Sequence, residues 1–211
     1  MDPNKLTQKS SEALHDAQTK ALRFGHAEVD PEHLLLALLE QPEGIVPSLL
    51  SRTGADPGRL AKNLEAELER RPRVSGPGVA PGQIAVTQRL SRLLDDAQQE
   101  ADRLRDEYVS VEHLVLAMLA EGPATGAGRL LHDEGVTRSA FLHALERIRG
   151  NQRVTSAMPE AAYEALAKYG QDLVAEAAAA VEGILNEGVD KAMSRFNRRV
   201  QAAGESDESS E

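Results

Sequence analysis

Apolar residues recur at helical spacing along the first part of the chain. Between Leu6 and Arg23 they lie mostly three or four positions apart, with charged residues between them, and this spacing predicts an amphipathic helix. All six positions of Leu34–Leu39 are apolar, which is typical of a helix that is buried on every side. Two further helices are predicted at Ile45–Leu50 and directly after Asp56.

The same pattern returns eighty positions later. PEHLLLALL at Pro31–Leu39 corresponds to VEHLVLAML at Val111–Leu119, since adding 80 to each residue number converts the first range into the second. Identical residues continue at this spacing on both sides, and they include the pairs Thr7/Thr87, Glu32/Glu112 and His33/His113. An internal repeat of this kind predicts two copies of one structural unit. We expect an all-α fold in which two four-helix units, residues 4–71 and 84–150, pack about a pseudo-twofold axis as one domain of residues 1–150.

Residues that favour helix starts mark the predicted boundaries. Thr7 and Thr87 can each accept a hydrogen bond from an otherwise unpaired amide of the first helical turn. The sequence Asp30-Pro31-Glu32 is typical of an N-cap, a first-turn proline and a first-turn acid. In the second unit the first helix is predicted over about Ile84–Leu104, and Ser110 is the expected cap of the helix that follows.

The other segments differ in composition from the repeats. Residues 72–83 are rich in proline and glycine and are predicted to be an inter-repeat linker. Residues 151–159 form a polar connector, and the alanine-rich residues 160–203 carry an apolar stripe that predicts a helical tail of one or two helices. Residues 204–211 are acidic and polar, which predicts a disordered end.

Composition limits the setting of the protein. The absence of cysteine excludes disulfides and thiol chemistry, and a net charge of -10 argues against non-specific binding to nucleic acid or to an anionic membrane. The longest apolar run, Leu34–Leu39, is far shorter than the roughly 20 residues that span a bilayer. The N-terminus lacks the apolar core of a signal peptide. We therefore expect a cytoplasmic protein that contacts neither nucleic acid nor membrane.

Motifs for catalysis are absent from the sequence. It contains no G-x-x-x-x-G-K-[ST] nucleotide-binding loop and no G-x-S-x-G nucleophile elbow. Glu32-His33 is not an HExxH zinc motif, because no second histidine follows it: the segment around Leu36 is apolar. His33 and His113 are better interpreted as core or helix-surface histidines. We therefore expect no enzyme, no metal site and no cofactor.

Three stretches in combination resemble one known family. They are the opening KLTQKSSEALHDAQ, the duplicated helices with EHLLLA and EHLVLA, and the exit GNQRVTSAMPEAAYEALAKYGQDL. Their order, spacing and duplication resemble the Clp N-terminal (Clp R) repeat domain found at the front of Clp-family AAA+ unfoldases and disaggregases. The resemblance covers about residues 3–175 and is strongest to ClpB-type disaggregases. In the family the exit helix leads into the ATPase, whereas here it runs into AEAAAAVEGILNEGVDKAMSRFNRRV.

The resemblance implies a site as well as a fold. In proteins with this domain, the module binds exposed segments of unfolded or aggregated polypeptide, or adaptors. The implied polar positions are Thr7, Thr87, Asp106 and Glu112, with Glu32 as the repeat mate of Glu112. They would border a groove between the two units. The structural alternative is that the threonines only cap helices and the glutamates only favour helix N-termini.

Other functions are compatible with the same residues. In the ClpC branch of the family, glutamates that match Glu32 and Glu112 bind phosphorylated arginine, and carboxylates do pair with guanidinium groups. The expected function is a non-enzymatic module that binds unfolded polypeptide, a chaperone adaptor or a ClpB-type hexamer. The alternative from another class is a structural or oligomerisation protein that self-associates through its tail helix, residues 160–203.

Overall fold

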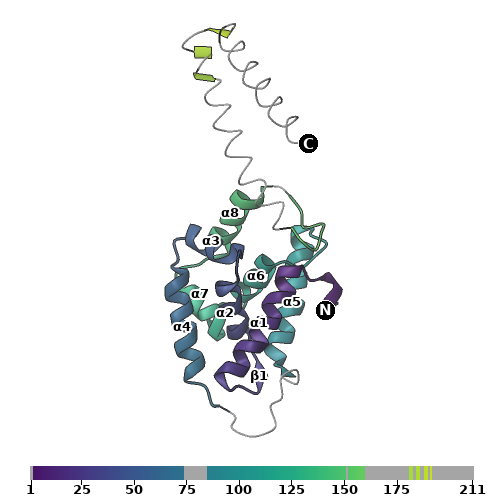
Figure 1. Cartoon of the computed structure of the whole chain (residues 1–211), viewed down its shortest axis with the longest axis vertical. Helices are drawn as coiled ribbons and strands as arrows, with labels where there is room; N and C mark the ends of the chain where they lie inside the picture. Colours follow the sequence, from purple (N-terminus) through teal and green to yellow (C-terminus); the bar gives the residue numbers. More distant parts are fainter. Residues whose placement is uncertain are drawn as a thin grey trace, which may run out of the picture. The chain divides into compact units, whose positions relative to one another are not determined.

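Eight α-helices make up most of the chain that the structure, a computed structural model, describes (Figure 1). The described residues are 2–73, 85–150 and 152–159, with 181–182, 184–185, 188–189 and 191 of the C-terminal segment. The first repeat forms α1 (Gln8–Phe24), α2 (Pro31–Glu40), α3 (Ile45–Arg52) and α4 (Pro57–Glu69). The second repeat forms α5 (Gln88–Leu104), α6 (Val111–Glu121), α7 (Gly126–Asp133) and α8 (Arg138–Arg149). The predicted all-α fold class is confirmed. Among the described residues, none of the helices has the length and apolar content needed to cross a membrane.

The chain divides into two compact units, residues 1–162 and 163–211. The described helical positions of the second unit are 181–182, 184–185, 189 and 191. The rest of the predicted tail at 160–203 and the acidic end at 204–211 lie outside the described residues. So do all but the first two residues of the predicted linker at 72–83. These parts of the domain organisation stay predictions.

The first helix of the second repeat starts later than its sequence pattern predicts. It begins at Gln88 and not near Ile84, because Ala85–Val86 is the strand β2 and Thr87 is the N-cap of α5. Strand β2 pairs in parallel with β1, Glu28–Val29, which uses the main-chain groups that a longer helix would need. The Thr87 N–H completes this contact by donating to the Val29 carbonyl oxygen over 3.0 Å.

Each repeat reaches across to the other through the residues before its first helix. Val86 pairs with Val29, and at the equivalent place Leu6, which follows the short 3-10 helix η1 (Pro3–Lys5), pairs with Val109. The two contacts are related by the repeat, since 6 + 80 = 86 and 29 + 80 = 109. Figure 1 shows the N-terminus beside α5 accordingly. The pairing is therefore reciprocal, as a pseudo-twofold arrangement requires.

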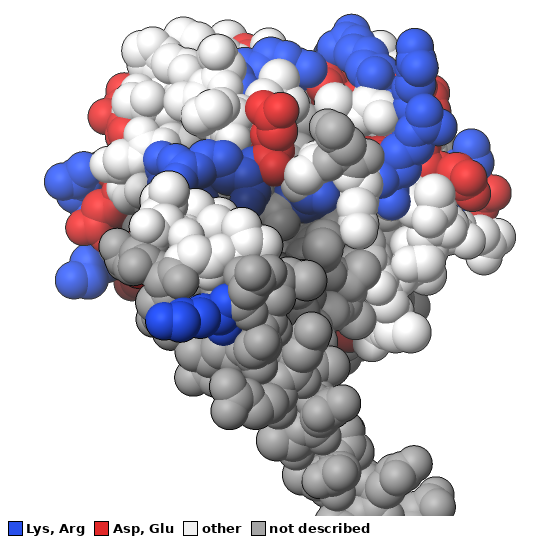
Figure 2. All heavy atoms as spheres, turned by 90° about the horizontal axis from the view of Figure 1, so that it is seen from above, with Lys and Arg blue, Asp and Glu red and all other residues white. Residues whose placement is uncertain are grey.

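Charged side chains of both signs are spread over the surface. On the face shown in Figure 2, lysine and arginine cover more of the visible surface than aspartate and glutamate, although the whole chain has a net charge of -10. Some of these charges join the repeats: Arg59 of α4 donates to both carboxylate oxygens of Glu134, which follows α7, over 2.8 and 2.6 Å. An ion pair whose arginine is exposed to solvent contributes little to stability. Such pairs help to orient the repeats, whereas apolar burial supplies most of the stability.

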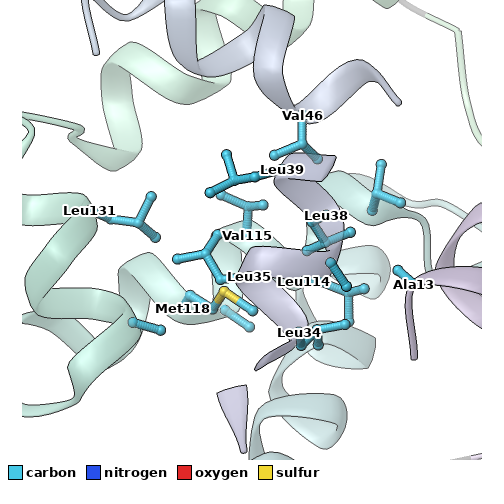
Figure 3. Close-up of a cluster of buried hydrophobic side chains, with 14 of the residues drawn as sticks. Ala13, Leu34, Leu35, Leu38, Leu39, Val46, Leu114, Val115, Met118 and Leu131 are labelled. Atoms are coloured by element: carbon cyan, nitrogen blue, oxygen red, sulfur yellow. The ribbon is translucent and has the colours of Figure 1, made fainter. Parts of the chain in front are cut away.

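The core lies where the central helices of the two repeats meet. Leu34, Leu35 and Leu38 of α2 are fully buried, as are Leu114 and Val115 of α6. Figure 3 shows these side chains gathered around α2, with Leu35 beside Val115 and Leu38 beside Leu114. Burial of one such side chain stabilises the fold by about 1.5–3 kcal/mol. The prediction of a fully buried central helix is confirmed in both repeats.

Candidate functional site

Each repeat builds a polar cluster around the start of its central helix. The first polar cluster consists of His26, Asp30, Glu32, His33 and Arg71, joined by Thr87 and Arg89 from the second repeat. The second polar cluster consists of Asp106, Ser110, Glu112, His113 and Arg149. Together they contain four of the five predicted site residues, and the fifth, Thr7, lies at the N-cap of α1.

Histidines complete the caps of both central helices. The N–H of the N-cap residue donates to the Nδ1 atom of the histidine three positions later, from Asp30 to His33 over 3.0 Å and from Ser110 to His113 over 2.9 Å. The side chain of the third helical residue thus returns to the cap, as in a capping box. Because Nδ1 is the acceptor, the proton of each neutral ring lies on Nε2. Both rings are buried, which confirms the interpretation as core histidines.

In the second polar cluster one carboxylate collects three donors. Asp106 Oδ2 accepts from His113 Nε2 over 3.0 Å and from Arg149 Nη1 over 2.7 Å. Its Oδ1 accepts from the main-chain N–H of Val154 over 2.8 Å. Burial by itself raises the pKa of Asp106, but the hydrogen bonds from His113, Val154 and Arg149 outweigh it and hold the pKa below its usual value. Asp106 is therefore a charged group that is already fully engaged.

Arg149 also contacts the second carboxylate of this cluster. Its Nη1 lies 3.3 Å from Glu112 Oε1, and the Glu112 side chain is completely buried. Two acidic side chains from different parts of the repeat thus share one buried guanidinium at the end of α8. Removing a buried carboxylate from water is costly without such a partner. Arg149 brings Asp106 and Glu112 together.

The first polar cluster differs at one decisive position. His26 occupies the place of Asp106, since 26 + 80 = 106, and its Nδ1 lies 2.7 Å from Nε2 of His33. Phe24 stacks on the His26 ring with centroids 5.8 Å apart. Burial, with the nearby charge of Arg71, lowers the pKa of His26. Burial and the neighbouring His26 lower the pKa of His33 to about 4. Both rings are therefore neutral near pH 7.

Two arginines from different repeats hold Glu32. Its carboxylate is fully buried, with Oε1 2.8 Å from Arg89 Nη2 and Oε2 3.0 Å from Arg71 Nη2. Both arginines also pair with Asp30, and Thr87 donates to Asp30 Oδ1 over 2.6 Å. Glu32 and Thr87 therefore lie in the same cluster and join the repeats there.

The two predicted threonines cap helices. Thr7 Oγ1 accepts from the Ser10 N–H over 3.3 Å, and Thr87 Oγ1 accepts from the Leu90 N–H over 3.1 Å. Thr7 is fully buried, and its main-chain N–H donates to the carbonyl oxygen of Val109, three residues after Asp106. The capping role is thus present at both positions. A role in binding at Thr7, Thr87, Asp106, Glu112 and Glu32 stays a prediction.

Two surface clefts lie at equivalent positions beside the clusters. One, of about 490 Å³, is lined by Asn4, Lys5, Asp106, Glu107 and Tyr108, and is called here the second-repeat cleft. The other, of about 410 Å³, is called here the first-repeat cleft and is lined by His26, Ala27, Glu28, Asp30, His33, Arg71, Pro72 and Thr87. Asp106 and Thr87 are the predicted site residues that reach these clefts. Within the described residues, no three His, Asp or Glu side chains gather in a way that could hold a metal ion.

Sequence reasoning missed the cationic half of both clusters. Arg71, Arg89 and Arg149 have no motif of their own and are far in sequence from the acids they contact. One signal was available: a glutamate at the start of an otherwise apolar, buried helix needs a counterion. The sequence does not show which of the chain's arginines supplies it.

The fold and the paired clusters define a class of protein, and the chain belongs to it. Residues 5–134 match the Clp repeat (R) N-terminal domain family. The chain is 54% identical over 177 residues to the chaperone protein ClpB of Nitratidesulfovibrio vulgaris, and 44% identical over 177 residues to the ClpB of Bacillus cereus. These alignments cover 84% and 83% of this chain but 20% of each relative, so the chain spans about a fifth of their length.

Solved structures share the same arrangement. The N-terminal domain of Hsp104 from Candida albicans superimposes with a TM-score of 0.63 at 20% identity, covering 74% of this chain and 99% of that one. The N-terminal domain of the ClpV1 ATPase from Escherichia coli superimposes with a TM-score of 0.55 at 28% identity, covering 66% of this chain and 83% of that one. The fold of residues 1–162 is thus the fold of a Clp N domain.

Proposed function

We propose that the chain is a non-enzymatic, cytoplasmic protein-binding module that recognises unfolded or aggregated polypeptide, or an adaptor that presents it. The observation that carries this proposal is the similarity of 84% of the chain to the corresponding fifth of a ClpB chaperone. A ClpB-type hexamer is the second kind of partner, because the chain is similar to part of that chaperone itself.

The proposed binding site is the second-repeat cleft, with Asp106 in its lining and Thr7 and Glu112 behind it. Glu32 and Thr87 are proposed to border the equivalent first-repeat cleft. Since Glu112 and Glu32 are fully buried, their proposed role is to fix the shape and charge of the cleft wall through Arg149, Arg71 and Arg89.

A titration of fluorescence anisotropy tests the proposal. A labelled, permanently unfolded polypeptide is titrated with the whole chain, and saturable binding is expected. Tyr108→Ala removes a half-buried side chain of the second-repeat cleft without touching the buried cluster. Glu28→Ala is its matched control, since 28 + 80 = 108 and Glu28 lines the other cleft. We expect Tyr108→Ala to weaken binding several-fold and Glu28→Ala to leave it unchanged.

Two results would contradict the proposal. Absence of binding at high micromolar protein would remove the polypeptide-binding function. Equal binding by wild type and both variants would move the site away from these clefts. Circular dichroism confirms that each variant keeps its helices. A double variant, Thr7→Ala with Glu112→Gln, then tests the groups behind the cleft, with glutamine keeping the size of the buried side chain.

The phosphoarginine alternative requires that an arginine of the chain leave its buried glutamate. An incoming guanidinium at Glu32 must displace Arg71 or Arg89, and one at Glu112 must displace Arg149. Free phosphoarginine added to the titration separates the two ligands, because it competes with the unfolded polypeptide under this alternative alone.

The described part of the tail supports a second candidate function, self-assembly. Val181, Ile184, Leu185 and Val189 have helical spacing and are 56%, 39%, 80% and 59% exposed. Apolar side chains that recur in this way suit a helix-helix interface. Sedimentation of the whole chain beside an Ile184→Asp/Leu185→Asp variant tests it: assembly requires a larger wild-type species that the variant loses.

A further inference from the structure

The connector after α8 is bound to the second repeat. Residues 152–159, called here the strap, leave the helix through Gly150 and pass beside Asp106. The Val154 N–H donates to Asp106 Oδ1 over 2.8 Å, and the Val154 carbonyl oxygen accepts from the Glu107 N–H over 2.9 Å. Both main-chain groups of one strap residue are therefore paired with adjacent residues of the repeat. Proteins bind extended peptides through main-chain contacts of the same type.

Side-chain burial and a second attachment hold the strap as well. The Val154 side chain is completely buried, with a relative exposure of 0%, although it is not part of the main hydrophobic core. Three residues later, the Ala157 carbonyl oxygen accepts from the N–H of Gln8, which follows Thr7 at the start of α1, over 2.8 Å. Between these attachments Thr155 and Ser156 are exposed. The strap is thus attached by hydrogen bonds beside Asp106 and again beside Thr7.

The first repeat has no equivalent attachment among its described residues. The helices α4 and α8 begin at residues 57 and 138, an offset of 81, so Arg73 is the counterpart of Val154. Arg73 is exposed, and His26, the counterpart of Asp106, faces His33 with its Nδ1. The carboxylate that accepts the strap amide is a feature of the second repeat. Attachment of the strap is therefore a feature of the second repeat and is not a general property of the fold.

We propose that the strap is an intramolecular occupant of the part of the polypeptide-binding site that adjoins the second-repeat cleft, at Asp106 and Glu107. The site takes an extended segment with one branched aliphatic side chain, which takes the buried place of the Val154 side chain while its main chain pairs with Asp106 and Glu107. External unfolded polypeptide with such a residue binds after it displaces the strap. The proposal rests on the polypeptide-binding function and specifies its ligand.

Release of the strap tests this proposal. Val154→Ser removes the apolar anchor from a position outside the main core, and Thr155→Ser is the matched control at the exposed neighbour. The probe is a labelled peptide of residues 152–159, QRVTSAMP, titrated into each whole chain. When the strap occupies the site, the apparent affinity for the peptide falls in proportion to the fraction of chains whose site is free. We therefore expect Val154→Ser to bind the peptide at least about tenfold more tightly than wild type. Thr155→Ser is expected to match wild type, and the peptide QRSTSAMP to bind none of them.

A measurement on the wild type tests attachment of the strap without relying on the folding of a variant. Hydrogen exchange is expected to be slow at the Val154 and Glu107 amides, and fast at Val154 after the Val154→Ser change. Exchange at Val154 as fast as at Thr155 in the wild type would overturn the strap, as would equal peptide affinity in all three chains. Failure of the strap with intact binding of unfolded polypeptide leaves the proposed function standing. Peptide binding to Val154→Ser without binding of unfolded polypeptide to any chain would leave the strap standing and overturn the proposed function.

Discussion

His26 and His33 form a buried pair, with 2.7 Å between Nδ1 of the first and Nε2 of the second, at the place where the second repeat has an aspartate and a histidine. The repeat therefore keeps the geometry and changes the charge. At the place where the second repeat has the ionised carboxylate of Asp106, the first repeat has the neutral ring of His26. This difference makes the two halves of the domain respond to different ranges of pH.

The histidine pair predicts a loss of stability in mild acid. The pKa of His33 is about 4 in the folded chain, below the 6.5 of an unfolded histidine, and that of His26 is also lowered. The unfolded chain thus binds more protons between these values, so stability is complete above about pH 6.5 and falls as the pH drops toward 4. We expect His33 to account for a loss of about 3 kcal/mol at most, measured by urea unfolding from pH 7.5 to 4.5.

Substitution His26→Asp provides the control for this acid response. It recreates the carboxylate-histidine pair of the second repeat, so the pKa of His33 is expected to rise and the loss above pH 4.5 to shrink. Asp106 does not contribute between pH 4.5 and 7.5. Because its pKa is lowered in the folded chain, the stability that it provides is lost only at pH values below the pKa of 3.8 that it has in the unfolded chain. An acid response that is identical in wild type and His26→Asp would contradict the assignment.

Arg149 is predicted to be the most sensitive residue of the second polar cluster. Arg149→Met leaves the buried carboxylates of Asp106 and Glu112 without their shared cation, and loss of one partner from a buried pair costs about 3–5 kcal/mol. Arg147→Met, two residues earlier on the exposed face of α8, is expected to change the free energy of unfolding by less than about 0.5 kcal/mol. Urea unfolding of both variants measures the difference.

The cap at Thr7 predicts separate effects on stability and on binding. Thr7→Val keeps the size of the side chain but removes the oxygen that accepts from Ser10, and loss of such a cap costs about 0.5–2 kcal/mol. Thr7→Ser keeps the oxygen and is expected to retain most of the stability. If Thr7→Ser weakens polypeptide binding while its melting temperature stays at the wild-type value, the buried threonine methyl group shapes the site from behind. If Thr7→Val matches wild-type stability, the cap assignment is wrong.

Gly126 is predicted to be intolerant of any side chain. A Cβ atom at this position would overlap the carboxylate oxygens of Glu32 and Glu67, and Glu32 is pinned by Arg71 and Arg89. We expect Gly126→Ala to lower the free energy of unfolding by about 1–3 kcal/mol. At Gly58, where the nearest atom to a new Cβ is Asp56 Oδ1 at 3.3 Å, alanine is expected to be tolerated. Thermal unfolding of the two variants compares them directly, and equal melting temperatures would refute the crowding at Gly126.

The limits of sequence reasoning are clearest in the second repeat. The apolar run of α6 and the cap at Ser110 were predictable, because both depend on neighbours within one or two helical turns. The start of α5 was not, because the strand Ala85–Val86 exists only through its partner Glu28–Val29 in the other repeat. A local pattern of residues that are compatible with a helix cannot reveal a competing contact with a distant strand.

The sequence by itself determined the repeat, the all-α fold and the burial of the central helices, since hydrophobic spacing and capping residues act locally. The tertiary structure alone decided which cation pairs with each buried acid and which main-chain N–H completes the bonds of Asp106. Arg89 reaches Glu32 across 57 positions, and Val154 reaches Asp106 across 48. Such pairs form because burial removes the carboxylates from water and requires donors nearby, and only the packing of the helices determines which donors those are.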